Sequence, residues 1–299
     1  MRKLVLALFF ASCSALGQET PSWFAESLLH LSDDVAEAAK EGKRVMLYFG
    51  QDGCPYCTRL MEVNFRQRPT VERMQKRFVA LALNIWGDRE VTWTDGKTLT
   101  EKQLAVLLKV QFTPTLIFLD EKGRIALRVN GYYAPERLNA ALDHVSGLIS
   151  ASDFRKMNSV STANAKLNEQ PFITDKRSGK PLVMLFETTH CAECDALHRE
   201  VFSRPEVLEQ IRKFDVMRFP VASKEARLRR VAYAPTIVLL DVRGREALRL
   251  EAYFRPFHVS GALDYVASGA YRKEPSFQRF LQAKSDRLRE KGSPVDLWK

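Results

Sequence analysis

The stretch Val45-Met46-Leu47-Tyr48-Phe49-Gly50-Gln51-Asp52-Gly53-Cys54-Pro55-Tyr56-Cys57 decides the fold of this chain. It begins with an apolar, β-prone run, which predicts a buried strand. A short loop with two glycines follows, and the two cysteines stand where a helix would begin. Unpaired N–H groups and the helix dipole favour a thiolate at such a helix start. The spacing of Cys54 and Cys57 therefore indicates redox chemistry.

A Thr-Pro step before another apolar run is the second landmark. It consists of Thr113 and Pro114, and the run Thr115–Leu119 leads to a turn at Gly123. Apolar runs that alternate with helical patterns, and that end in a hairpin and a last helix, predict a layered α/β fold.

The same layout occurs again later in the chain. Cys191 and Cys194 follow a second apolar run, 137 positions after the first pair. Ala234 and Pro235 lie 121 positions after the Thr-Pro step. The two offsets differ by 16 residues, and the polar stretch 84–100, which we expect to be an exposed insertion, accounts for most of this difference. Two constant offsets predict a tandem duplication.

Length and composition agree with two globular domains. The chain has 299 residues, of which 45% are hydrophobic, and this length exceeds that of a typical single domain. The formal charge is +10, but no nucleic-acid motif accompanies it, so we interpret the excess as a solvated surface. No segment after the N-terminus is long and apolar enough to cross a membrane.

The N-terminus predicts a signal peptide over residues 1–17. A basic start and a short apolar core precede Ala15-Leu16-Gly17, which offers the small residues that a signal peptidase reads. The stretch 10–13 also resembles a lipoprotein box, so lipid attachment at Cys13 is an alternative. Export implies a periplasmic or extracellular location, where disulfides form and persist.

Cysteine usage favours redox chemistry over a structural framework. The chain has five cysteines, and removal of the signal peptide leaves only the two Cys-x-x-Cys pairs. Zinc binding by four cysteines is the alternative. The pairs are 134 positions apart, far beyond the usual spacing of such zinc sites. We therefore expect no metal and no cofactor.

The domain boundaries follow from composition. The predicted segments are a first domain at 18–150, a linker rich in Ser, Ala, Asn and Lys at 151–170, a second domain at 171–270, and a basic, helical tail at 271–299. Either packing against the second domain or binding to a partner fits the tail, and we favour packing.

Strand, glycine-containing loop, Cys-x-x-Cys helix, X-Pro step and hairpin together resemble the thioredoxin fold, twice over. The resemblance implies two tandem thioredoxin-like domains, each a central mixed sheet flanked by helices. The first half resembles exported, SoxW-like periplasmic thioredoxins. The resemblance also implies that Pro114 and Pro235 are cis and lie beside the cysteine pairs, since X-Pro is the peptide bond at which cis is inexpensive.

The resemblance assigns roles to the first pair. Cys54 would be the exposed, attacking thiol, and the more buried Cys57 would resolve the mixed disulfide. The positions that would contact the substrate are Pro55, Tyr56, Thr113, Pro114, Ala234 and Pro235.

The second pair, Cys191 and Cys194, would act in the same way. However, Glu193 between them would disfavour a thiolate, whereas a protonated His190 would favour it. A redox-inert second domain that binds partners therefore stays open. Typical thioredoxins also carry a buried carboxylate six positions before the first cysteine, where this chain has Tyr48 and Leu185. The sequence therefore predicts that this internal proton acceptor is missing.

The preferred function is reduction of protein disulfides in the periplasm, with disulfide isomerisation or oxidation as the alternative. The partners would be periplasmic proteins with disulfides and a membrane thiol reductase as electron donor.

Overall fold

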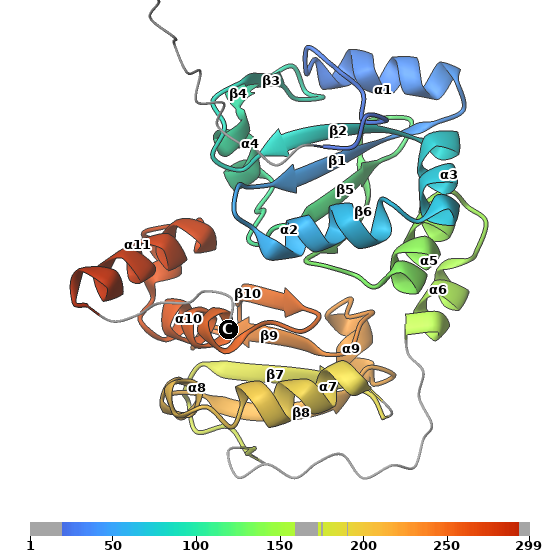
Figure 1. The fold of residues 1–299 in the computed structure, drawn as a ribbon. Coiled ribbons are helices and arrows are strands. Elements are labelled where there is room, and N and C mark those ends of the chain that lie inside the picture. Colours follow the sequence, from blue (N-terminus) through green and yellow to red (C-terminus); the bar gives the residue numbers. More distant parts are fainter. Residues whose placement is uncertain (1–19, 159–172, 175, 190, 293–299) are drawn as a thin grey trace, which may run out of the picture.

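The first half of the chain folds around a four-stranded mixed sheet (Figure 1). The structure is a computed structural model that describes residues 20–158, 173–174, 176–189 and 191–292. The elements of this domain are α1 (Leu31–Lys40), β1 (Arg44–Gly50), α2 (Pro55–Arg59), the π-helical turn η1 (Leu60–Asn64), α3 (Arg68–Arg77), β2 (Phe78–Asn84), β3 (Glu90–Thr92), β4 (Thr98–Thr100), α4 (Glu101–Leu107), β5 (Thr115–Leu119), β6 (Ile125–Asn130), α5 (Pro135–Val145) and α6 (Ala151–Asn158). The strand order is β2-β1-β5-β6, with β1 and β2 parallel and the other pairs antiparallel.

The second half forms a sheet of the same order. Its elements are β7 (Leu182–Glu187), α7 (Ala192–Ala196), the π-helical turn η2 (Leu197–Val201), α8 (Pro205–Ile211), β8 (Asp215–Pro220), α9 (Lys224–Leu228), β9 (Thr236–Leu240), β10 (Glu246–Glu251), α10 (Pro256–Ala267), the 3₁₀ turn η3 (Ala270–Arg272) and α11 (Phe277–Glu290). The order β8-β7-β9-β10 repeats that of the first sheet, and β7 and β8 are its parallel pair. The prediction of two tandem α/β domains is confirmed.

The central strand β1 shows why the stretch 45–57 decides the fold. Side chains alternate between the two faces of a strand. Met46 and Tyr48 therefore join the cluster that contains the first cysteine pair, and Leu47 and Phe49 join the cluster under α1 and α4. Helices cover both faces, and each fully buried side chain of this size contributes about 1.5–3 kcal/mol.

The predicted insertion at 84–100 contains the β3–β4 hairpin. Polar residues dominate this stretch, but Val91 is fully buried among the residues packed under α1. The insertion is therefore anchored by Ile85 and Val91, with Trp93 and Leu99 packed partly against the same cluster, and its outer residues are exposed.

Short helices adjoin the predicted boundaries. The structure places α6 at the start of the predicted linker, where it contacts α5. In the predicted tail, α11 packs on α10. The predicted signal peptide, Cys13 and most of the linker lie outside the described residues. Within the described residues, no helix combines the length and the apolar character needed to cross a bilayer.

Candidate active sites

The first cysteine pair lies at the start of α2, directly after the loop that leaves β1. Cys54 is the N-cap residue, and Pro55 occupies the first helical turn, where no N–H is needed. The backbone N–H of Cys57 donates a hydrogen bond to Sγ of Cys54 at 3.1 Å. The two cysteines form a disulfide, with Cα atoms 5.2 Å apart. The start of α2 therefore supplies a backbone hydrogen-bond donor to Sγ of Cys54, the atom that would carry the negative charge of a thiolate.

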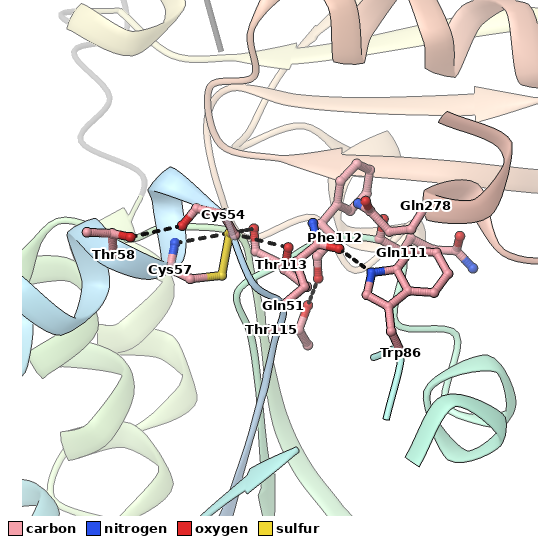
Figure 2. Close-up of a disulfide and its surroundings, with 10 residues drawn as sticks. All are labelled: Gln51, Cys54, Cys57, Thr58, Trp86, Gln111, Phe112, Thr113, Thr115 and Gln278. Atoms are coloured by element: carbon pink, nitrogen blue, oxygen red, sulfur yellow. Dashed lines mark hydrogen bonds between the residues drawn. A yellow bond between two sulfur atoms is a disulfide. The ribbon is translucent and has the colours of Figure 1, made fainter. Parts of the chain in front are cut away.

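The Thr-Pro step faces this sulfur. The Thr113–Pro114 peptide bond is cis, as predicted. The Thr113 hydroxyl donates to Sγ of Cys54 at 3.4 Å, and the Thr113 carbonyl oxygen lies 3.5 Å from the same sulfur (Figure 2). The resemblance thus placed these two segments correctly next to each other, although they are 59 residues apart in the chain.

The second pair repeats this geometry with one difference. Cys191 caps α7, its Sγ accepts a hydrogen bond from the N–H of Cys194 at 3.0 Å, and the two form a disulfide. The Ala234–Pro235 bond is cis, as predicted. Ala234 has no hydroxyl, so the second site lacks the side-chain donor that Thr113 supplies to the first.

The exposures of the two sites differ, and one prediction is wrong. Cys54, expected to be exposed, is 1% exposed, whereas Cys191 is partly exposed. Thr113 and Cys57 contact the sulfur of Cys54, and Tyr233 and Ala252 of the second domain belong to the same buried cluster. We therefore expect access of a protein substrate to Cys54 to require movement of the second domain.

The interface between the domains has approximate two-fold symmetry. The rings of Phe112 and Phe254 lie 4.6 Å apart, and those of Tyr133 and Tyr233 lie 4.9 Å apart. An offset of 121 residues converts one pair into the other. Each domain therefore presents to its neighbour the aromatic residue that lies two positions before its cis-proline.

The terminal helices of both domains extend this interface. Phe277 of α11 packs on Phe112 with ring centroids 5.4 Å apart, and Phe154 of α6 packs on Tyr233 at 6.0 Å. Gln278 donates to the carbonyl oxygen of Gln111 at 2.9 Å (Figure 2). The segment that leads to each cis-proline is thus held by the other domain.

The residues between the cysteines also contact the opposite domain. Burial raises the pKa of the Tyr56 hydroxyl, and the charge of Arg255 together with its hydrogen bond to Tyr56 acts against that rise. Glu193 lies 3.6 Å from Arg137, whose guanidinium stacks on Tyr233 at 4.1 Å. Pro55 is exposed, so it faces away from this interface.

The sequence interpretation missed an ionisable group near the second pair. Tyr48 and Leu185 do occupy the expected carboxylate positions, and burial raises the pKa of Tyr48, with a further rise from the charge of Asp52. The second domain nevertheless buries Glu187, which lies 2.6 Å from the ring of His198. A carboxylate at the end of an apolar run and a histidine four residues after Cys194 were the available signals.

Within the part of the chain that the structure describes, neither domain brings metal ligands together. Among the described residues, no group of three or more His, Cys, Asp or Glu side chains is placed to hold a metal ion.

Solved structures with the same fold resemble single halves of this chain. A thioredoxin-fold protein from Helicobacter pylori is 23% identical, with a TM-score of 0.34, and the match covers 44% of this chain and 91% of that one. A thioredoxin from Thermus thermophilus is 24% identical, with a TM-score of 0.32, and the match covers 39% and 83%. The C-terminal domain of DsbD from Neisseria meningitidis is 17% identical, with a TM-score of 0.26, and the match covers 29% and 81%. No curated protein matches the chain.

The family assignment rests on the sequence pattern of the Thioredoxin-like domain. That pattern matches residues 31–146 and 169–267, which include both cysteine pairs and both cis-prolines. The specific resemblance to SoxW-like proteins stays a prediction. With a redox-capable pair at a helix start in each domain, the protein is a thiol–disulfide oxidoreductase. The chain belongs to the thioredoxin-like family, and it carries the family's domain twice.

Proposed function

We propose that this protein reduces disulfides of exported proteins, with Cys54 as the attacking thiol and Cys57 as the resolving thiol. The observation that carries the proposal is the pair of donors at Sγ of Cys54, which are the N–H of Cys57 and the hydroxyl of Thr113. Hydrogen bonds to a thiolate favour the charged form. In the second site, Ala234 has no hydroxyl, and the donor to Sγ of Cys191 among the described residues is the N–H of Cys194.

The reaction consists of two exchange steps. The Cys54 thiolate attacks one sulfur of the substrate disulfide, and the other sulfur leaves as a thiolate and takes up a proton. The Cys57 thiol then loses its proton and attacks Sγ of Cys54, which releases the second substrate sulfur as a thiol. The products are a reduced substrate and the Cys54–Cys57 disulfide. A membrane thiol reductase would then return two electrons to this disulfide.

Thr113, Pro114, Pro55 and Tyr56 would contact the substrate, with Ala234 and Pro235 in the same role at the second site. The periplasmic location is supported by the export signal predicted over residues 1–17. Two pairs that can cycle between dithiol and disulfide suit a compartment in which disulfides persist.

A second candidate is a relay in which Cys191 and Cys194 meet the substrate and the first pair supplies the electrons. The partial exposure of Cys191, against the buried Cys54, favours it. Isomerisation or oxidation of substrates would use the same residues. A redox-inert second domain that binds partners is the remaining alternative.

The test replaces each resolving cysteine in the full chain. Cys57→Ser and Cys194→Ser prolong the mixed disulfide with the substrate, so captured proteins can be identified on Cys54 or Cys191. Capture on Cys54, together with reduction of insulin by the unmodified chain, supports the proposal. Capture on Cys191 alone supports the relay. Oxidation of a reduced substrate that outpaces reduction would contradict the proposed direction.

A further inference from the structure

A buried ionisable cluster lies within the second domain, and the proposed exchange at Cys54 does not use it. Glu187 and His198 are 2% and 7% exposed. Nε2 of His198 lies 2.6 Å from one carboxylate oxygen of Glu187, and Nη1 of Arg218 lies 3.6 Å from the other. Burying a charged group is costly unless it is paired, so such a cluster in a small domain needs an explanation.

The position of His198 places it near the resolving cysteine. Cys194 and His198 are four residues apart in the continuous helix formed by α7 and η2, so they lie on the same helix face. Both are buried.

The two nitrogens of His198 have different surroundings. If Glu187 is ionised, it accepts the hydrogen of Nε2, which fixes the tautomer. Nδ1 is buried and has no hydrogen-bond partner among the described residues. The imidazole therefore keeps a lone pair on the nitrogen that is free to accept a proton. This is the arrangement by which a carboxylate prepares a histidine as a base.

We infer that His198 accepts the thiol proton of Cys194 when this cysteine resolves a mixed disulfide on Cys191, and that Glu187 is the positioning residue. The inference rests on the proposed exchange chemistry and extends it to the second pair. In this step the S–H bond of Cys194 breaks and its proton passes to Nδ1. The thiolate then attacks Sγ of Cys191, and the substrate sulfur leaves with the electron pair of the broken S–S bond. Solvent later removes the proton from the imidazole.

The groups around the ring suit a positive charge that forms during this step. Glu187 from β7 would pair with the imidazolium, Arg218 from β8 compensates the carboxylate, and the Phe202 ring packs 5.4 Å from the imidazole. The first domain has Gly50 in place of Glu187, and a Cβ there would collide with the Tyr48 hydroxyl. The acceptor is therefore a property of the second site alone.

The experiment separates attack from resolution with one probe, the aromatic disulfide 5,5′-dithiobis(2-nitrobenzoate). In the reduced full chain with Cys13→Ser, Cys54→Ser and Cys57→Ser, the first coloured thiolate reports attack by Cys191 and the second reports resolution by Cys194. We expect His198→Met, which copies the first domain, to slow the second phase at least tenfold at pH 7, since general bases contribute about 10²–10⁴-fold. The first phase should be unchanged. The deficit should disappear as the pH approaches the ordinary thiol range near ~8.5.

Two further variants test the positioning role of Glu187. Glu187→Gln should reproduce the deficit and its pH dependence, and Glu187→Asp should restore part of the rate. The control introduces His198→Met into a chain with Cys13→Ser, Cys191→Ser and Cys194→Ser, where both phases belong to the first pair and should not change. Because that chain keeps Cys54 and Cys57, it also measures exchange at the first pair, which is the proposed function, without a contribution from the second pair.

Three results would overturn the inference. The first is a second phase within twofold of the parent at every pH. The second is a deficit that high pH does not remove, which would indicate a structural role. The third is a Cys191–Cys194 pair that does not react with the probe. None of them bears on exchange at Cys54.

Discussion

The two domains share a fold, a cysteine spacing and a cis-proline, and they differ in the groups around the sulfur atoms. In the first site, the Thr113 hydroxyl donates to Sγ of Cys54, and the phenol of Tyr48, whose pKa is raised, stands six positions before that cysteine. The second site has neither group at the paired positions. Instead, the second site has a buried carboxylate–imidazole pair and a partly exposed first cysteine. The paired positions are Thr113 and Ala234, Tyr48 and Leu185, Gly50 and Glu187, and Met61 and His198.

The two copies thus share the framework and differ in the groups that lie around the cysteine sulfurs. Donors to the attacking sulfur favour the first step of exchange, and a proton acceptor favours the second. The interface joins both cis-proline segments, so neither site is independent of the other domain. Three predictions test this contrast between the domains.

The largest expected effect is a selective loss of stability of the second domain in acid. Burial lowers the pKa of His258 from 6.5 to about 4. The folded pKa lies below the unfolded one, so the unfolded chain binds more protons between pH 6.5 and 4, and the free energy of unfolding falls as the pH falls through that window. A shift of this size corresponds to about 3 kcal/mol. The counterpart in the first domain is Arg137, so that domain has no histidine at this position.

Hydrogen exchange at pH 7 and pH 4.5 measures this loss separately for each domain. Protection in β7, β9 and α10 should fall more than protection in β1, β5 and α5. His258→Gln removes the titration, so it should reduce the difference between the two pH values even if it lowers stability at both. Equal losses in both domains would contradict the prediction.

The second prediction concerns access to Cys54. Tyr233→Ala removes a ring that packs against Tyr133, Phe154 and Arg137 of the first domain. The loss of about 2 kcal/mol expected for such a truncation corresponds to roughly 30-fold more of the open form. In the reduced protein, alkylation of Cys54 by iodoacetamide should accelerate by that factor, and alkylation of Cys191 should change little.

Peptide mass spectrometry reports both cysteines in one sample. Phe280→Ala is the matched control, because that ring packs on Tyr265 and Phe277 within the second domain. Its effect on Cys54 should be small. If Cys54 of the unmodified reduced protein reacts as fast as Cys191, the interface does not cover it in solution.

The sequence predicted the framework well and the environment of the sites less well. Apolar periodicity, the cysteine spacing and the constant offsets depend on local patterns, so both sheets were predicted, and the resemblance to the thioredoxin fold implied both cis-prolines. The buried cluster around Cys54 includes Tyr233 and Ala252, which are about 180–200 residues away and have no local signature. Glu187 was missed because its partners, His198 and Arg218, come from two other elements.

The smallest expected effect concerns the residue after the last strand of each sheet. Gly131 has φ +78°, and its counterpart Ala252 has φ +96°, a conformation that costs an L-residue about 1–2 kcal/mol. A Cβ at Gly131 would meet Phe254 at an ordinary 3.5 Å, so Gly131→Ala should cost about 1 kcal/mol through the backbone alone. Ala252→Gly removes the same strain. However, it also removes a buried methyl worth about 0.8 kcal/mol and adds the entropy cost of glycine, so the net change should be close to zero. Urea denaturation of both variants measures the difference, and a gain above about 1 kcal/mol for Ala252→Gly would show that the methyl contributes nothing to the interface.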